Sequence, residues 1–269
     1  MFTHCSFDMI SKTRFKKIQA LKHKRGRIEQ GLFLIEGLRL CEEALLSDHK
    51  LKMLLVCHQN LDHQAARKVM ELAQQRQVEI VAIDGVAAKQ LAETVHSQGI
   101  FGIVQQQQSP LERLFDEAWR FLVIVDTGQD PGNVGTIIRA CDWFGVDAVV
   151  FSKGSVELYN PKVVRSTMGS IFHVPVFENT KLELLLPALK QRGFQIFAAD
   201  VQGEQWYHRV QYRLPLALIM GNENRGVDRE LESQVDCTIA IPRHGQAESL
   251  NMAVAAGIIL SKIAETINQ

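Results

Sequence analysis

The feature that most limits the fold is a series of apolar runs without polar alternation in the second half of the chain. FLVIVD (121–126), VDAVVF (146–151), FQIFAAD (194–200) and LPLALIM (214–220) each read as a strand buried on both faces. Such strands belong to parallel sheets, because the helices that connect parallel strands cover both faces of the sheet. The sequence therefore predicts an α/β fold with a parallel sheet.

The stretches between these runs have apolar residues at helical spacing and predict the connecting elements. We expect a helix over 133–144, a helix over 161–170, a short strand over 172–177, a helix over 181–193 and a final helix that begins near Leu250.

The first hundred residues also alternate helical and strand-like segments, from a basic helix near the start to the strand-like IFGIV (100–104). They predict a small α/β domain. QQQQSP (105–110) is polar, aperiodic and ends in proline, which is typical of an interdomain linker. We therefore expect a boundary near Ser109, with one domain over 1–108 and a second over 109–269.

Positive charge gathers in the segment 11–27, although the formal net charge of the whole chain is +0. This segment contains eight Lys or Arg residues and no acidic residue. Clustered cations bind nucleic acid by releasing condensed counterions from its phosphates. A solvated face of a terminal helix is the alternative. The candidate RNA-binding residues are Lys12, Arg14, Lys16, Lys17, Lys22, Lys24, Arg25 and Arg27.

The segment DPGNVGTIIRACDWFG (130–145) follows the first apolar run of the predicted parallel sheet. Asn133 is well placed as the N-cap of the helix, and this structural role alone would explain it. Arg139 lies off the apolar stripe of the helix, so it must reach solvent or an anionic partner. The segment lacks the G-x-G-x-x-G pattern of dinucleotide-binding turns, which argues against a nicotinamide or flavin cofactor here.

Two later turns also follow apolar runs. GNENRGVDREL (221–231) carries Glu223 between two glycines, which let the backbone approach a ligand at the carboxyl edge of the sheet. An ordinary glycine turn is the alternative. IPRHGQAESLNMAVAAG (241–257) contains a polar loop, the candidate helix cap Ser249 and then small residues, which permit close packing against a ligand, another element or a second subunit.

Together these three segments resemble the SpoU (TrmH-type) branch of the SPOUT RNA methyltransferases. The first motif of that family, Asn-x-Gly-x-x-x-Arg, is matched by Asn133, Gly135 and Arg139. The second motif is similar to MGNENRGV (220–227), and the third is similar to IPRHGQAESLNMAVAAGI (241–258).

Two further segments resemble the same family. NPKVVRSTMGSIFHVPV (160–176) looks like the region between its motifs, so the resemblance covers about residues 121–264. FLIEGLRLCEEAL (33–45) is similar to the substrate-binding domain found ahead of many such enzymes, which resembles ribosomal RNA-binding α/β proteins.

The resemblance implies a fold and a cofactor that the residues alone do not. It implies that the C-terminal segment is threaded through a loop to form a trefoil knot. The implied cofactor is S-adenosylmethionine, held in the knot by backbone around Gly221, Ile241 and Leu250. It also implies a homodimer whose active site is completed across the interface.

The implied activity is methyl transfer from S-adenosylmethionine to a ribose 2′-hydroxyl of structured RNA, with ribosomal RNA favoured over transfer RNA. Since a guanidinium does not deprotonate in proteins, Arg139 is expected to bind phosphate and stabilise charge. A transfer-RNA 2′-O-methyltransferase, a base-methylating SPOUT enzyme and a non-catalytic RNA-binding protein of the same fold are the alternatives. The resemblance gives as site residues Asn133, Arg139, Glu223, Ser249 and Asn251.

The expected compartment is the cytoplasm. No apolar run reaches membrane-spanning length, and the first residues lack the layout of a signal peptide. The five cysteines are scattered without a C-x-x-C pair, so we expect reduced packing residues and neither a disulfide framework nor a metal site.

Overall fold

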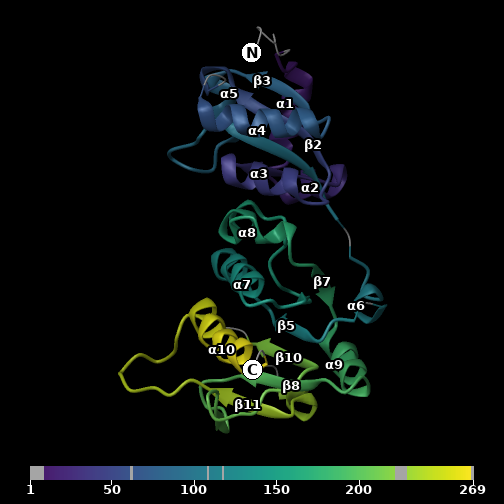
Figure 1. The fold of residues 1–269 in the computed structure, drawn as a ribbon, viewed down its shortest axis with the longest axis vertical. Helices are drawn as coiled ribbons and strands as arrows, with labels where there is room; N and C mark the ends of the chain where they lie inside the picture. Colours follow the sequence, from purple (N-terminus) through teal and green to yellow (C-terminus); the bar gives the residue numbers. More distant parts are fainter. Residues whose placement is uncertain (1–8, 61–62, 108, 117, 222–228, 268–269) are drawn as a thin grey trace. The chain divides into compact units, whose positions relative to one another are not determined.

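The chain packs as two compact units (Figure 1). Unit 1 comprises residues 1–107 and 159–172, and unit 2 comprises 108–158 and 173–269. The division into an RNA-binding domain over 1–108 and a catalytic domain over 109–269 stays a prediction. Within these units, the computed structural model describes residues 9–60, 63–107, 109–116, 118–221 and 229–267.

Unit 1 contains a mixed sheet of four strands in the order β1-β4-β2-β3. Strand β4 runs antiparallel to β1 and β2, whereas β2 and β3 are parallel. This is the small α/β domain that the sequence predicts. The strands are β1 (Leu32–Glu36), β2 (Leu51–Cys57), β3 (Glu79–Ile83) and β4 (Ile100–Gln105).

The basic segment forms two helices where the sequence predicts one. Helix α1 ends at Ala20, and α2 begins at Lys24. Gly26 of α2 lies so close to the Ala20 carbonyl that a Cβ at this position would clash with it, and only glycine permits this approach. The helices of unit 1 are α1 (Lys12–Ala20), α2 (Lys24–Gln30), α3 (Leu38–Leu46), α4 (Gln64–Gln75), α5 (Gly85–Leu91) and α8 (Pro161–Thr167).

Unit 2 contains a sheet of seven strands in the order β7-β6-β5-β10-β8-β11-β9, in which every neighbouring pair is parallel. The parallel sheet predicted from the apolar runs is therefore confirmed. Its strands are β5 (Phe121–Val125), β6 (Ala148–Ser152), β7 (Val176–Thr180), β8 (Gln195–Ala199), β9 (Gln205–Trp206), β10 (Leu216–Met220) and β11 (Cys237–Ala240).

One predicted strand is displaced along the chain. The strand expected over 172–177 lies at Val176–Thr180. A 3-10 turn at Ser170–Phe172 precedes it, and Pro175 has no backbone N–H with which to continue the strand towards the N-terminus.

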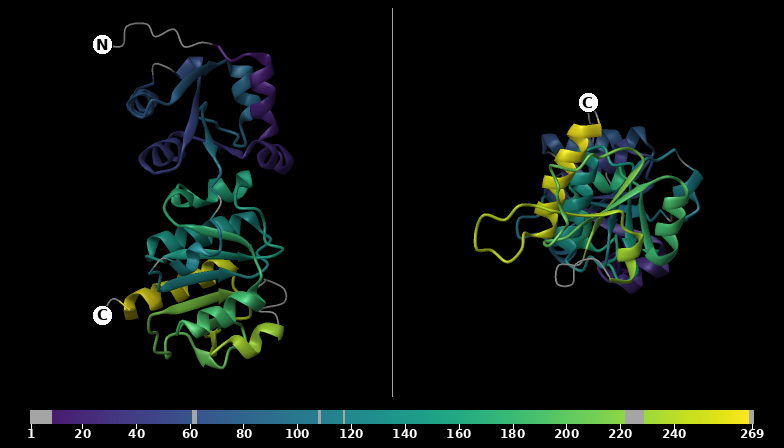
Figure 2. Two further views of the ribbon diagram at one scale, coloured as in Figure 1. Left: turned by 90° about the vertical axis from the view of Figure 1, so that its right-hand side faces the viewer. Right: turned by 90° about the horizontal axis from the view of Figure 1, so that it is seen from below.

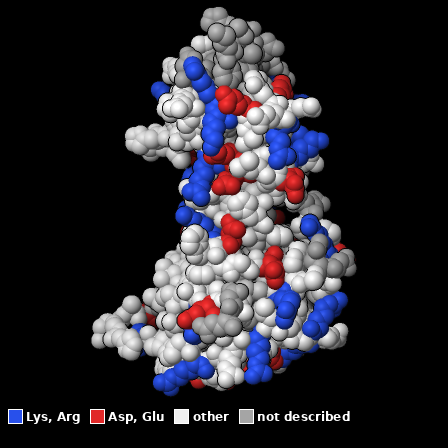
Figure 3. Space-filling model, in the orientation of Figure 1, with Lys and Arg blue, Asp and Glu red and all other residues white. Residues whose placement is uncertain are grey.

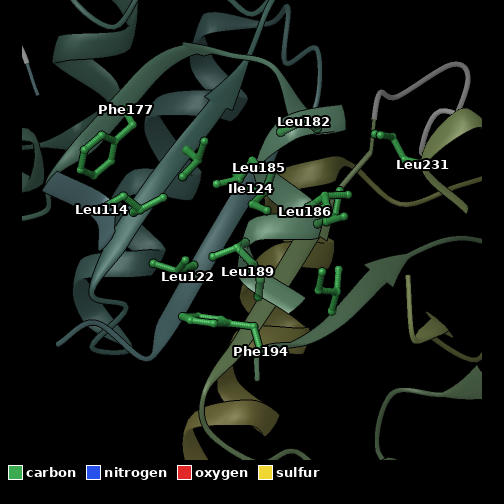
Figure 4. Packing of buried hydrophobic residues seen from close by; sticks show 14 of the residues in the cluster. Leu114, Leu122, Ile124, Phe177, Leu182, Leu185, Leu186, Leu189, Phe194 and Leu231 are labelled. Atoms are coloured by element: carbon green, nitrogen blue, oxygen red, sulfur yellow. The ribbon is translucent and has the colours of Figure 1, made fainter. Parts of the chain in front are cut away.

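Helices cover both faces of the unit 2 sheet. Figure 4 shows the leucines of α9 (Leu182–Gln191) packed against Leu122 and Ile124 of β5. The alternate residues of β5 point to the opposite face, where Val125 lies beside Val134 of α7. Helices α7 (Pro131–Trp143) and α10 (Met252–Ile267) pack side by side there (Figures 1 and 2). The short helix α6 (Arg113–Asp116) precedes β5.

Within the described ranges, no helix is long and apolar enough to cross a bilayer. The threading of the C-terminal segment into a trefoil knot stays a prediction.

Candidate active site

The predicted site residues follow strands that end at one edge of the parallel sheet. Strands β5, β10, β8 and β11 are parallel neighbours, so their carboxyl ends lie at the same edge. The turn into α7 follows β5, Gly221 follows β10 and Ile241 follows β11. This edge is where open α/β sheets bind their ligands.

Helix α7 begins earlier than the sequence predicts. Its N-cap is Asp130, whose Oδ1 accepts a hydrogen bond of 2.8 Å from the backbone N–H of Asn133, and Pro131 occupies the first turn. The prediction that Asn133 is the N-cap is therefore wrong. Because Asp130 provides the cap, the Asn133 side chain is available to another element.

That other element is the start of α10. The side-chain Nδ2 of Asn251 donates a hydrogen bond of 2.8 Å to Oδ1 of Asn133. The Oδ1 of Asn251 accepts from the backbone N–H groups of Ala253 and Val254, at 2.9 and 3.2 Å. Asn251 thus caps α10, in place of the predicted Ser249, and ties it to α7. The first and third motifs meet at this pair.

Arg139 lies on the exposed side of α7. Val134, Ile137, Ile138 and Cys141 of the same helix are completely buried, whereas Arg139 is exposed. The prediction that Arg139 lies off the apolar stripe is confirmed. Among the residues that the structure describes, no carboxylate forms an ion pair with Arg139. The guanidinium can therefore receive an anionic ligand.

Cys141 is the nearest thiol to Arg139 in the sequence, and it takes no part in the site. Burial raises the pKa of this thiol far above its ordinary value, so the nucleophilic thiolate does not form at neutral pH. Cys41 and Cys57 are also buried and free, as expected of packing residues, and Cys5 lies outside the described residues.

Gly221, Ile241, Ser249 and Leu250 lie in the segments that follow β10 and β11. Gly221 and Ile241 are half-buried at the carboxyl ends of their strands. Residues 243–250, with Ser249 and Leu250, form an exposed loop that projects from unit 2 (Figure 2). Glu223 lies outside the described residues.

The residues at these strand ends suit a ligand with apolar parts. Gly221 offers backbone without a side chain, and Ile241 offers a half-buried apolar surface. S-adenosylmethionine has an adenine ring that such surfaces accommodate, so the residues present fit this cofactor.

One buried group at this edge is missing from the sequence-based prediction. Asp126 directly follows β5 and is 7% exposed, and its Oδ1 accepts hydrogen bonds from the hydroxyls of Ser152 and Thr127. It is the last residue of the run FLVIVD, which reads as strand. The signal in the sequence is a carboxylate at the end of an otherwise apolar run.

Comparison with known proteins decides the family. The model of the SpoU rRNA Methylase family matches residues 120–261. The chain is 35% identical over 247 residues to the 23S rRNA (guanosine(2553)-2′-O)-methyltransferase RlmP of Bacillus subtilis (strain 168), covering 92% of this chain and 94% of the relative. The chain belongs to the SpoU rRNA Methylase family. The resemblance drawn from the three motifs is thereby confirmed.

Solved structures of methyltransferases share the fold over nearly the whole chain. The SpoU methyltransferase AviRb from Streptomyces viridochromogenes, in complex with the cofactor AdoMet (S-adenosylmethionine), superposes with a TM-score of 0.84 and 28% identity. It covers 95% of this chain and 98% of its own. An AdoMet-bound rRNA methyltransferase from Sinorhizobium meliloti gives a TM-score of 0.81 with 29% identity, covering 96% and 97% of the two chains.

The N-terminal part of this SpoU protein has its own match. Residues 12–102 match the model of the MRM3-like substrate binding domain. The match includes α1 and α2, which carry the basic residues that the sequence singles out.

Four of these eight cations are held within unit 1. Arg14 forms a two-pronged ion pair with Glu79, and Lys22 pairs with Glu93 at 3.1 Å. Arg25 pairs with Glu29 one helical turn away, at 2.6 Å. Arg27 is 2% exposed and donates to the backbone carbonyls of Leu21 and Lys22, so it stabilises the turn between α1 and α2.

The other four cations face solvent. They are Lys12, Lys16, Lys17 and Lys24. Within the described part of the chain, no acidic side chain pairs with them. Figure 3 shows basic and acidic side chains close together over much of the face of unit 1 that it presents. The four lysines are therefore the part of the basic segment that is available to a polyanion.

Proposed function

We propose that this protein is an S-adenosylmethionine-dependent methyltransferase that methylates a ribose 2′-hydroxyl of ribosomal RNA. The observation that carries the proposal is the Asn251–Asn133 hydrogen bond, which joins the first and third SpoU motifs at the ligand-binding edge of the sheet. The names of the relatives support the reaction and the substrate, since RlmP is a 23S rRNA 2′-O-methyltransferase and AviRb binds AdoMet.

The proposed cofactor residues are Gly221, Ile241 and Leu250. Bound S-adenosylmethionine supplies an electrophilic methyl group on a positively charged sulfur. In the transfer, the bond between methyl and sulfur breaks, a bond from the ribose oxygen to methyl forms, and the hydroxyl proton leaves to a base or to solvent. The protein must therefore align the hydroxyl with the methyl group and stabilise the oxygen as it loses its proton.

Arg139 is proposed to stabilise the negative charge that develops on the ribose oxygen as it loses its proton. It is exposed on α7 two turns from its start, where its positive charge can bind a phosphate beside the reacting ribose. Its guanidinium stays protonated in proteins, so it acts through its charge and not as the base. Asn133 and Asn251 are proposed to shape the site between α7 and α10, and Glu223 and Ser249 complete the proposed set.

Unit 1 is proposed to hold the RNA. Lys12, Lys16, Lys17 and Lys24 are exposed, and the exposed ion pair of Arg25 with Glu29 costs little to break. These cations can bind phosphates without exposing a buried group. We extend this to the domain layout, with an RNA-binding domain over 1–108 and a catalytic domain over 109–269, and to a cytoplasmic location.

A homodimer through the catalytic domain is also part of the proposal. Val254 of α10 is 52% exposed, and Trp143 of α7 is 84% exposed, so both leave apolar surface in water. Gly257 and Ile258 lie one turn beyond Val254 on α10 and are only half-buried. A second copy that covers these residues would remove apolar surface from water.

The deciding experiment is to map 2′-O-methylated nucleotides in total RNA from cells with and without the protein, followed by transfer in vitro to the RNA found. A site in ribosomal RNA that disappears without the protein supports the proposal. A lost site in transfer RNA would redirect it to a transfer-RNA 2′-O-methyltransferase. Mass spectrometry that places the methyl group on a base, or calorimetry without S-adenosylmethionine binding, would contradict it.

A further inference from the structure

We infer that Asp126 is a positioning residue for methyl transfer, which acts through Ser152 and Thr127 to hold the turn between β5 and α7 in place. This inference rests on the proposed function for its reaction, but the arrangement itself is a property of the fold. Asp126 touches neither Arg139 nor the Asn133–Asn251 pair, so its effect on them must pass through the turn.

The carboxylate of Asp126 is buried and satisfied by hydroxyl groups. It is 7% exposed, and its Oδ1 accepts from Ser152 Oγ at 2.7 Å and from Thr127 Oγ1 at 3.0 Å. Ser152 Oγ in turn accepts from the backbone N–H of Thr127 at 2.7 Å. Burying a carboxylate is costly unless it is hydrogen-bonded, and an apolar residue would continue the buried run without that cost. The network therefore needs a reason other than stability.

The backbone of Thr127 gives that reason. Its φ is +51°, in the left-handed region that a β-branched residue rarely adopts. Such a conformation persists only where surrounding contacts hold it, and it is found at functional sites more often than elsewhere. Both side-chain and backbone groups of Thr127 are bound by Asp126 and Ser152, so these two residues maintain the strained turn.

The next residue of the turn is also held. Gly128 donates its N–H to Ser155 Oγ at 3.2 Å, and its carbonyl accepts from the N–H of Val156 at 2.8 Å. A Cβ on Gly128 would lie 2.6 Å from Val125 Cγ1 and 2.9 Å from Val134 Cγ2, so the turn is packed against both β5 and α7. The turn after β5 is thus fixed to the segment after β6 on one side and to α7 on the other.

This turn connects β10, which precedes the proposed cofactor residue Gly221, to α7, which carries the proposed site residue Asn133. The N–H of Asp126 donates to the carbonyl of Met220 at 2.9 Å, and Met220 directly precedes Gly221. At the other end of the turn, Asp130 caps α7 and sets the position of Asn133. A substitution of Asp126 keeps the backbone bond to β10 but removes the side-chain bonds that hold Thr127, so it is expected to shift α7 relative to β10 without removing a group that touches either ligand.

The chain provides a matched control at the opposite end of the same strand. Asp147 Oδ2 accepts hydrogen bonds from the backbone N–H groups of Arg120 and Phe121, both at 2.8 Å, and so holds the start of β5 in place. It is a structural carboxylate away from the ligand-binding edge. Asp126→Ala and Asp147→Ala each delete a carboxylate that accepts two hydrogen bonds at one end of β5, but only Asp126→Ala is expected to loosen the turn.

The test compares kcat, KM for RNA and S-adenosylmethionine binding by calorimetry in Asp126→Ala, Ser152→Ala, Asp126→Asn and Asp147→Ala. We expect kcat to fall about 10- to 100-fold in the first two variants, because a displacement of about 1 Å has effects of this size. In these two variants, the affinity for S-adenosylmethionine should change less than about threefold. Asp126→Asn should recover part of kcat. Asp147→Ala should lower the melting temperature and retain kcat. Unchanged kcat in folded Asp126→Ala, or equal losses in Asp147→Ala, would overturn the inference.

Hydrogen exchange of the backbone amides at 127–133 separates this inference from the proposed function. Exchange should be faster in Asp126→Ala and Ser152→Ala than in the wild type, and unchanged there in Asp147→Ala. If the wild type transfers no methyl group but the variants show these differences in exchange, the proposed function is wrong. The conclusion that Asp126 and Ser152 hold the turn in place is then still supported. If exchange at 127–133 is the same in all variants, Asp126 does not position the turn, whatever the activity.

Discussion

The side-chain amide of Asn251 donates a 2.8 Å hydrogen bond to the side-chain oxygen of Asn133, across 118 positions of sequence. The same asparagine caps α10 through its own oxygen. One side chain therefore stabilises a helix and joins the two motifs that form the proposed site. These two roles use different atoms, so they can be separated by substitution.

Asn251→Asp is expected to keep the cap and lose the link to Asn133. A carboxylate still accepts from the first N–H groups of α10, and its negative charge is favourable at a helix N-terminus. It has no N–H to donate to Asn133. The melting temperature should stay close to that of the wild type while kcat falls at least tenfold. Asn251→Ala should lose both the activity and about 1 kcal/mol of stability. A fully active Asn251→Asp would show that donation from residue 251 to Asn133 is not needed for catalysis.

Arg139→Ala is expected to abolish methyl transfer while S-adenosylmethionine binding survives. The side chain is exposed and makes no ion pair with a described residue, so its removal should not unfold α7. Arg139→Lys keeps the charge but loses the planar pair of donors that suits a phosphate, and should recover only a minor part of the rate. Single-turnover transfer and calorimetry measure the two effects. Full activity of the alanine variant would remove Arg139 from the mechanism.

Lys16→Gln with Lys17→Gln is expected to weaken RNA binding and to reduce its dependence on salt. Each lost phosphate contact should lower the slope of log affinity against log salt by about 0.7 to 0.9. Lys50→Gln with Lys52→Gln removes two exposed lysines of unit 1 outside the basic segment, and is the charge-matched control. Binding measured at several salt concentrations compares the pairs. An equal loss of RNA affinity in the two double variants would indicate a general electrostatic attraction to RNA instead of a contact at α1.

Gly257→Ala tests the proposed homodimer. A Cβ at Gly257 would meet no atom within 4 Å, so alanine should stabilise α10 by about 1 kcal/mol in a single chain. If a second copy packs closely on this face, the same methyl group should instead weaken association. Sedimentation and thermal unfolding over a range of concentrations measure both. A wild type that stays monomeric at all concentrations would exclude the homodimer.

The Arg14–Glu79 pair predicts a weak acid sensitivity of unit 1. The hydrogen bond from Arg14 lowers the pKa of Glu79 below its ordinary value, so the ionised form is favoured in the folded state. This stabilisation is present above the unfolded pKa of about 4.5 and is lost as pH falls through the lower folded pKa. The pair is 43% and 48% exposed, so the effect should be below about 1 kcal/mol. Glu79→Gln should remove it from unfolding curves between about pH 3 and 6, whereas an unchanged acid slope would exclude the pair as its source.

The sequence predicted the main elements well where burial alone decides them. The apolar runs became β5, β6, β8 and β10, because a strand covered on both faces has only apolar positions. Helix ends were less predictable. The start of α7 depends on whether Asp130 or Asn133 meets the first free N–H groups, and both residue types are good caps.

By itself, the sequence determined the parallel α/β fold of unit 2, the order of the three motifs and the family to which they belong. Only the tertiary structure decided which side chains meet. It joined Asn251 to Asn133, enclosed Asp126 with Ser152, and buried Arg27 beneath a turn where the charge pattern placed it on the surface. The physical reason is that periodicity reports the burial of an element's own face, whereas a hydrogen bond between distant residues depends on how the elements pack in three dimensions.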